Sequence, residues 1–176
     1  MKHVLAFLLL ASSMYAQSSA GEARLAAGCG PTSVSFKVAV SKEQHPTPRP
    51  EPGKAIVYLI QQDVTDPNYT SLTGGATLKV GLDGDWIGAT HGRSYLYFAV
   101  EPGEHRVCTS WQSIVAAATR LGSAVTVTAE PGKSYYLRAK VEERTERQPS
   151  IKLEIIDDAE GQFDISNSGL SIAHRK

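Results

Sequence analysis

Hydrophobic and polar residues alternate with a period of two along most of the chain, the pattern of β-strands with one buried face. Ile151, Leu153 and Ile155, for example, alternate with charged residues. The continuous apolar run 55–60 instead predicts a central strand that is buried on both faces. The predicted strands are 34–40, 55–60, 78–82, 95–100, 107–111, 125–129, 135–141 and 151–156.

The triplet Glu-Pro-Gly occurs three times, with its glycine at Gly53, Gly103 and Gly132. Proline presets the first central position of a type II turn, and glycine at the second position accepts a positive φ. The copies are unequally spaced, so they are not a structural repeat. We interpret them as turns that begin strands, and we expect the second and third copies to join successive antiparallel strands. Asp83-Gly84 predicts a hairpin that leads into Trp86-Ile87.

Short strands joined by turn residues predict an all-β protein, an antiparallel β-sandwich of about seven to eight strands, with a closed barrel as the alternative. Only residues 112–121 have a helical composition, enough for a short helical turn. We assign 54–165 to the sandwich domain and 166–176 to a C-terminal tail. Residues 21–53 hold an N-terminal strand and a proline-rich connector.

The connector has a proline at every second position from Pro46 to Pro52. Prolines at this density lock φ and remove hydrogen-bond donors, which favours an extended or polyproline II segment. We interpret it as a stiff connector laid across the domain. A ligand for a proline-recognising domain is the alternative.

The N-terminus has a basic start, an apolar run over 4–11 and a tract of small residues. These features predict a secretory signal peptide over residues 1–20, cleaved between 16 and 20. The apolar run is too short to span a bilayer, and no later run could anchor the mature chain as a transmembrane segment. We therefore expect an exported protein, periplasmic or extracellular.

The charge balance and the two cysteines bear on the partner and on the covalent structure of the protein. Acidic and basic residues balance at 18 each, so no net field points to nucleic acid as a partner. The two cysteines of an exported chain, Cys29 and Cys108, predict one disulfide. Lipid attachment at Cys29 is the alternative, but the charged segment 21–24 separates this cysteine from the apolar run.

Patterns for catalysis and metal binding are missing from the sequence. No serine or cysteine lies in a nucleophile motif. The histidines of the mature chain form no pair at metal-ligand spacing: they are His45, His91, His105 and His174. The carboxylates considered for glycoside chemistry occupy positions where turns favour aspartate: they are Asp83, Asp85, Asp157 and Asp158. We assign no catalytic residue, metal or cofactor and expect no enzyme activity.

Aromatic residues are the feature that points to binding. Adjacent predicted strands place Tyr95, Tyr97 and Tyr136 within reach of one another, so these three are the candidate binding residues. On one exposed face they would form a platform for a sugar ring or for the apolar patch of a partner. Aromatic filling of a sandwich core accounts for the same residues without a ligand.

Several segments resemble the bacterial domain-of-unknown-function family numbered 2846: 53–58, 100–105, 130–138 and 160–162. The likeness covers Gly53 to Ile165, and its short elements are also similar to those of PEGA-type surface β-sandwiches. The resemblance implies an exported bacterial β-sandwich. It implies no activity, because none is established for the family.

The leading hypothesis is therefore a non-catalytic exported β-sandwich of the bacterial envelope, an interaction or structural module whose partner is an unidentified envelope protein or glycan. The alternative is a carbohydrate- or peptide-binding protein that uses the aromatic strand face. A hydrolase is the third and weakest hypothesis.

Overall fold

The computed structural model describes residues 29–62, 75–113, 121–144 and 148–176. The predicted signal peptide lies outside these residues, as does most of the helical turn predicted over 112–121. The described elements are β1 (Phe36–Ser41), β2 (Ala55–Gln61), β3 (Thr77–Leu82), β4 (Asp85–His91), β5 (Ser94–Val100), β6 (Gly103–Trp111), β7 (Gly122–Ala129), β8 (Ser134–Arg144), β9 (Gln148–Ile156), α3 (Asp158–Ser166) and β10 (Gly169–Arg175). The predicted all-β class is confirmed, although the described residues form ten strands rather than seven to eight, and the pairs β10–β5 and β2–β8 are parallel rather than antiparallel.

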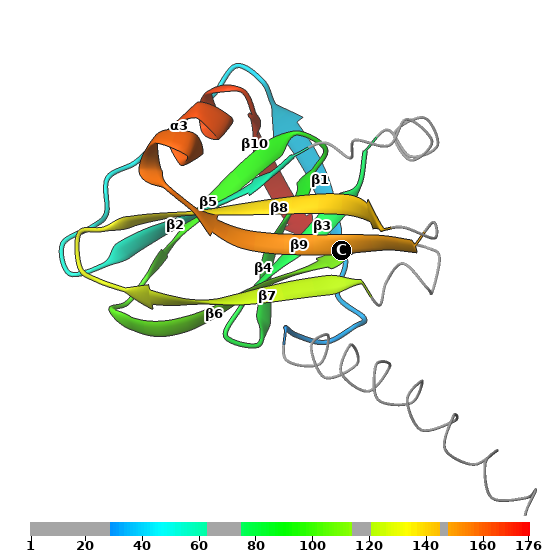
Figure 1. Ribbon diagram of the computed structural model, residues 1–176, viewed down its shortest axis with the longest axis horizontal. Helices are drawn as coiled ribbons and strands as arrows, with labels where there is room; N and C mark the ends of the chain where they lie inside the picture. The colour runs from blue at the N-terminus through cyan, green and yellow to red at the C-terminus, as the bar shows by residue number, and fades with distance from the viewer. Residues whose placement is uncertain (1–28, 63–74, 114–120, 145–147) are drawn as a thin grey trace, which may run out of the picture.

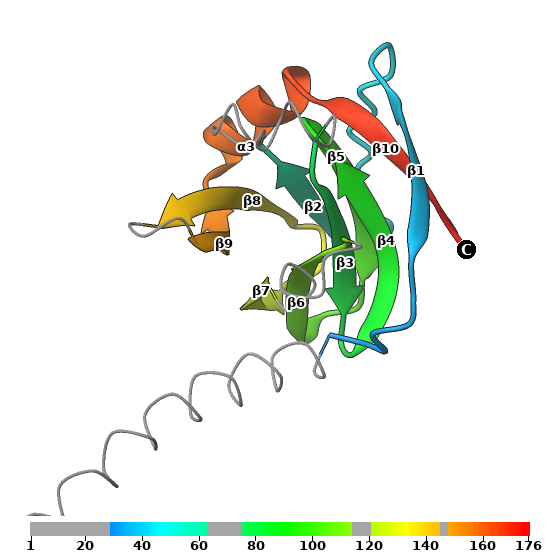
Figure 2. The ribbon, with the colours of Figure 1, turned by 90° about the vertical axis from the view of Figure 1, so that its right-hand side faces the viewer.

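The strands form two sheets that face each other (Figure 2). The six-stranded sheet has the order β1-β10-β5-β2-β8-β9, and the four-stranded sheet has the order β4-β3-β6-β7. At one side β9 approaches β7, where the Leu153 N–H donates a hydrogen bond to Ser123 Oγ at 3.1 Å. The main core lies between the sheets and includes Val57, Leu59 and Leu78.

β2 is buried on both faces, as its continuous apolar sequence predicts. It pairs antiparallel with β5 and parallel with β8. Val57 and Leu59 face the core between the sheets, whereas Tyr58 and Ile60 belong to a second cluster on the other face of the sheet. A single strand therefore contributes to both hydrophobic clusters.

All three Glu-Pro-Gly glycines have positive φ: Gly53 +83°, Gly103 +135° and Gly132 +76°. The pairing predicted for the second and third copies is wrong, however. They connect β5 to β6 and β7 to β8, and in both cases the chain passes from one sheet to the other (Figure 1). Turn residues mark the end of a strand but do not specify which sheet the next strand joins. Asp83-Gly84 does form the predicted hairpin, between β3 and β4.

The C-terminal residues are not a tail, which corrects the predicted boundary of the sandwich domain. β10 lies inside the six-stranded sheet, paired antiparallel with β1 and in parallel with the start of β5. Its buried positions include Gly169 and Ser171 rather than large apolar residues. A Cβ on Gly169 would lie 2.5 Å from Val40 Cγ1. Small residues allow this close approach, but they leave only a weak hydrophobic period in the sequence.

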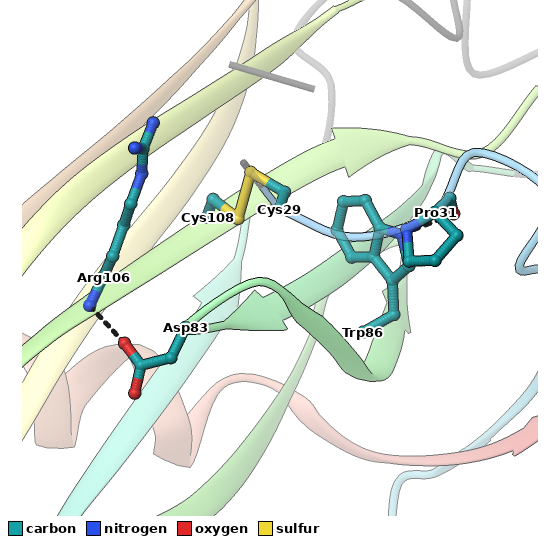
Figure 3. Close-up of a disulfide and its surroundings, with 6 residues drawn as sticks. All are labelled: Cys29, Pro31, Asp83, Trp86, Arg106 and Cys108. Atoms are coloured by element: carbon teal, nitrogen blue, oxygen red, sulfur yellow. Dashed lines mark hydrogen bonds between the residues drawn. A yellow bond between two sulfur atoms is a disulfide. The ribbon is translucent and has the colours of Figure 1, made fainter. Parts of the chain in front are cut away.

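The predicted disulfide between Cys29 and Cys108 is present, with the two α-carbons 5.9 Å apart (Figure 3). Both cysteines are buried. They cover Gly81 so closely that a Cβ there would lie 2.7 Å from the Cys29 carbonyl oxygen. Trp86 Nε1 donates to the carbonyl of Pro31 at 2.9 Å. The bridge and this bond fasten the segment that precedes β1 onto the four-stranded sheet.

Lys79 lies beneath the same N-terminal segment. Its side chain is buried, its ammonium donates to the Val34 carbonyl at 3.3 Å, and it stands 4.3 Å from the centre of the Trp86 ring. Burial lowers the pKa of Lys79, because the charged ammonium loses hydration. The segment therefore covers this face of the sheet. Within the described residues, no helix is long and apolar enough to cross a membrane.

Candidate functional site

The three candidate tyrosines lie on one face of the six-stranded sheet, and a fourth, Tyr58, stands between two of them. The strand register places Tyr58 opposite Tyr97 on β5 and opposite Tyr136 on β8. The rings of Tyr58 and Tyr136 are stacked with centroids 5.1 Å apart, and the rings of Tyr58 and Tyr97 are tilted with centroids 5.8 Å apart. Tyr95 is two residues from Tyr97 and so shares this face.

These tyrosines do not form an exposed platform. Tyr58, Tyr95 and Tyr136 are buried, and only Tyr97, at 37% exposure, reaches solvent to a substantial degree. The exposed strip of Tyr95, Tyr97 and Tyr136 is therefore not formed, and the burial of Tyr95 and Tyr136 agrees with the other interpretation, in which aromatic residues fill the interior. The side chains share a face as expected, but other segments of the chain cover most of it.

The proline-rich connector is one of the covering segments. Tyr58 donates its hydroxyl hydrogen to the carbonyl of Pro48 at 2.8 Å, and Tyr95 donates to the carbonyl of Pro46 at 3.0 Å. The intervening Thr47 is exposed, whereas the two prolines are half-buried. The connector thus lies along the sheet with its prolines inward, as the sequence predicts for a stiff segment laid across the domain.

Burial has a direct electrostatic consequence for the tyrosines. It raises the pKa of Tyr58 to about 12, and the neighbouring tyrosines add to this rise. Burial likewise raises the pKa of Tyr95 to about 12. A phenol is protonated at physiological pH even at its ordinary pKa, and the rise extends to higher pH the range in which both hydroxyls can donate the hydrogen bonds that hold the connector.

Helix α3 is the second covering segment, and it packs against the Tyr136 ring. Asp157 is the N-cap residue, and its side chain accepts a hydrogen bond from the Glu160 N–H at 2.8 Å. Gly161 faces Tyr136, where a Cβ would stand only 2.2 Å from the ring. Glycine is therefore required for this contact, although it weakens a helix relative to alanine.

Charged side chains also attach α3 to the sheet. Arg138 of β8 forms salt bridges with Glu154 of β9 at 2.8 Å and with Glu160 of the helix. A third carboxylate, that of Asp164, stands 3.8 Å away. The Arg138 side chain is mostly buried and well supplied with carboxylate partners, so its role in the described structure is to join β8, β9 and α3.

A pocket of about 390 Å³ remains between the connector, the sheet and α3. The connector supplies His45, Thr47, Pro48, Arg49 and Pro50; the sheet supplies Tyr58, Ser134 and Tyr136; the helix supplies Gln162, Ile165 and Ser166. In Figure 1 the connector is the cyan trace that leaves the end of β1 and passes beside α3 before it turns back into β2. The volume lies within the range of small-molecule sites.

Neutral and basic groups make up the polar part of the lining. His45 Nε2 donates to the Lys42 carbonyl at 3.0 Å, and Ser166 Oγ donates to the Phe163 carbonyl at 2.7 Å. Gln162 forms a side-chain hydrogen bond with Tyr136. None of the described residues that line the pocket is acidic.

His91 and His105 have structural partners elsewhere in the molecule. His105 Nδ1 is 2.7 Å from the Asp83 carboxylate, and its Nε2 is 2.7 Å from the Glu101 carbonyl oxygen. His91 Nδ1 is 2.8 Å from the Thr77 hydroxyl. No group of three or more histidine, cysteine, aspartate or glutamate side chains in the described part of the chain could hold a metal ion.

The four aspartates considered for glycoside chemistry occupy turns and ends of elements rather than a common site. Asp83 lies in the β3–β4 hairpin turn, and Asp85 begins β4. Asp157 caps α3, and Asp158 begins the helix. None of these four aspartates lines the pocket between the connector and α3.

Comparison with known proteins finds no match: no protein-family model, no curated protein and no solved structure matches this chain. The resemblance to the domain-of-unknown-function family numbered 2846 therefore stays a prediction. The interpretation of the site rests on its own geometry.

Sequence reasoning missed the helix and with it one wall of the pocket. Asp157 followed three residues later by Glu160 is a recognisable signal for the start of a helix. The subsequent residues have almost no amphipathic period, because the helix presents Gly161 rather than a large apolar side chain to Tyr136. The capping signal could have identified α3, but the pocket itself depends on long-range packing.

Proposed function

We propose that this chain is a non-catalytic β-sandwich that is exported and acts at the bacterial envelope as an interaction or structural module. The observation that carries the proposal is the buried disulfide between Cys29 and Cys108. Disulfides persist in the periplasm and outside the cell, whereas the cytoplasm keeps most thiols reduced. The basic, apolar and small-residue N-terminus supports the same compartment.

The bridge also bears on the alternative in which Cys29 carries a lipid. A sulfur atom bonded to Cys108 is not available for a thioether link to a diacylglyceryl group. The proposal is therefore a periplasmic or extracellular protein whose N-terminal segment is attached by a disulfide to its own sandwich, with an unidentified envelope protein or glycan as its partner.

Fractionation of the native organism combined with mass spectrometry tests this function. We expect the chain in the exported fraction, with an N-terminus between residues 17 and 21, and a disulfide-linked pair of peptides that contain Cys29 and Cys108. Cross-linking in the envelope fraction should capture a reproducible partner. Recovery of the intact chain in the cytoplasm with two free thiols would refute the proposal.

A second candidate function, carbohydrate or peptide binding, is favoured by the pocket between the connector and α3. The pocket has a volume of about 390 Å³ and three walls. These walls are the stacked Tyr58 and Tyr136 rings, the connector and the short helix α3. This binding surface, the pocket, differs from the exposed strip of tyrosines that the sequence suggested as an alternative. A small ligand would enter the pocket instead of lying on a flat aromatic face.

A further inference from the structure

We propose that the pocket between the connector and α3 binds a carboxylated saccharide, such as a uronic acid unit of an envelope glycan. This inference rests on the second candidate function, binding in the pocket, and specifies its ligand. Three properties of the pocket support it: the sign of its charged residues, the chemistry of its neutral polar groups, and the stiffness of its walls.

The basic residues of the lining, His45 and Arg49, both belong to the connector, and Arg49 carries a permanent positive charge. Arg49 is exposed and forms no salt bridge with any residue that the structure describes. Arg138, in contrast, is surrounded by three carboxylates. A guanidinium offers five N–H donors in a planar fork that matches a carboxylate. Arg49 is therefore free to receive a carboxylate from a ligand.

The neutral polar groups fit a ligand that is rich in hydroxyls. Thr47, Ser134 and Gln162 come from the connector, the sheet and the helix, so polar groups surround the pocket on all three walls. Hydroxyl and amide groups both donate and accept hydrogen bonds, as the hydroxyls of a sugar do. Ile165 and the proline rings supply apolar surface for the C–H groups of a pyranose.

Asp158 is an acidic side chain that acts on Tyr136 of the pocket wall. It begins α3. Burial is the main cause of the raised pKa of Tyr136, and the negative charge of Asp158 adds to the rise. Asp158 does not line the pocket. The described lining therefore offers basic side chains on the connector wall and no carboxylate on any wall. This arrangement orients an anionic ligand with its carboxylate toward Arg49.

The connector wall is fixed before a ligand arrives. Its prolines lock the backbone, and the hydroxyls of Tyr58 and Tyr95 hold the Pro48 and Pro46 carbonyls. A wall that is already ordered loses little conformational entropy on binding. Arg49 stands next to Pro48, so its backbone position is set by the same hydrogen bonds.

Calorimetric titration of the oxidised mature chain with three probes tests the inference. The probes are digalacturonate, its methyl ester, and a tripeptide with a free C-terminal carboxylate. The ester has the same ring structure as the acid but no charge. We expect digalacturonate to bind about tenfold or more tightly than the ester, the range of a charged hydrogen-bonded pair. Arg49→Gln should weaken digalacturonate binding to the level of the ester.

Arg106→Gln is the matched control. It removes an equal charge from an exposed arginine on β6, in the other sheet, and should leave binding of digalacturonate unchanged. Thr47→Trp fills the pocket from the connector side and should abolish binding of both sugars. Thermal melting and non-reducing peptide mapping of each variant verify that the fold and the bridge are intact.

The possible outcomes separate this inference from the function on which it rests. Equal affinity for acid and ester, with both lost in Thr47→Trp, would refute the carboxylate and leave glycan binding in the pocket standing. Preference for the tripeptide would refute the saccharide and support peptide binding. Failure of all three probes would refute both this inference and the second candidate function. None of these results affects the export test, which uses no ligand.

Discussion

Removal of the disulfide by the double change Cys29→Ala and Cys108→Ala should strongly destabilise the sandwich. The bridge joins residues 79 apart in the sequence. In the chain-entropy relation, a closed loop of this length restricts the unfolded chain by about 15 cal/mol/K, which corresponds to about 4.5 kcal/mol at 25 °C. This figure is an upper bound, because residual structure in the unfolded chain reduces it. We expect the free energy of unfolding to fall by about 3–4.5 kcal/mol.

The N-terminal segment has other attachments that should keep it docked without the bridge. Trp86 donates to the Pro31 carbonyl, and Gln112 exchanges two hydrogen bonds with the backbone of Phe36, at 2.7 and 2.8 Å. Each such bond contributes about 0.5–1.5 kcal/mol net. The variant should therefore unfold in one cooperative transition, with the loss arising mainly from the freer unfolded chain.

Urea unfolding followed in parallel by tryptophan fluorescence and far-ultraviolet circular dichroism measures both expectations. The wild-type protein in excess reductant serves as the control, because it removes the bridge without changing either side chain. A variant whose free energy of unfolding lies within 1 kcal/mol of the oxidised wild type, roughly the size of one hydrogen bond, would refute the reasoning. A change in fluorescence ahead of the circular dichroism would show that the Trp86 region detaches first.

Three further changes address the turns and the titratable groups. Gly132→Val should lower the free energy of unfolding by about 1–3 kcal/mol through backbone strain, because φ is +76° and nothing within 4 Å would meet the new Cβ. His105→Gln should flatten the decline in stability with rising pH: its hydrogen bond to Asp83 raises the pKa of His105, so the stabilisation is complete below pH 6.5 and is lost as pH rises through the raised folded value. Ultraviolet titration should detect the late ionisation of Tyr58 and Tyr95 near pH 12, with stability declining as pH rises from 10.0 through this range.

Each of these has a control that distinguishes the cause. Gly132→Asn should keep most of the stability, since asparagine tolerates positive φ; an equal loss in both variants would contradict the strain argument. If urea midpoints between pH 5.5 and 8.5 change as much in His105→Gln as in the wild type, the histidine does not carry the pH dependence; this window extends on both sides of the ordinary histidine pKa of about 6.5. Tyr58→Phe with Tyr95→Phe should remove the late-ionising phenols, and an unchanged titration curve would contradict their assignment.

The sequence predicted the elements of the candidate site better than the site itself. It identified the stiff connector and placed Tyr95, Tyr97 and Tyr136 on strands that lie near one another. It did not predict that the connector would cover these rings, because the hydroxyl of Tyr58 meets the Pro48 carbonyl only after β2 has paired with β5 and β8. The exposure of an aromatic residue depends on what packs above it, and local patterns contain no information about that.

Local physical chemistry determined the features that depend on neighbouring residues. A period of two places alternate side chains on opposite faces of a strand, and a proline followed by glycine fits a turn with positive φ, so strands and turns could be predicted from the sequence. An even cysteine count in a chain expected to be exported likewise predicted the bridge between Cys29 and Cys108.

Tertiary structure alone decided the features that depend on distant residues. The chain passes between the sheets at Gly103 and at Gly132, β10 is inserted between β1 and β5, and α3 packs on Tyr136 through Gly161. In each case the deciding interaction joins segments far apart in the chain, and small residues carry the contact in β10 and α3. A glycine contributes no hydrophobic period, so its role becomes visible only when the opposing surface is in place.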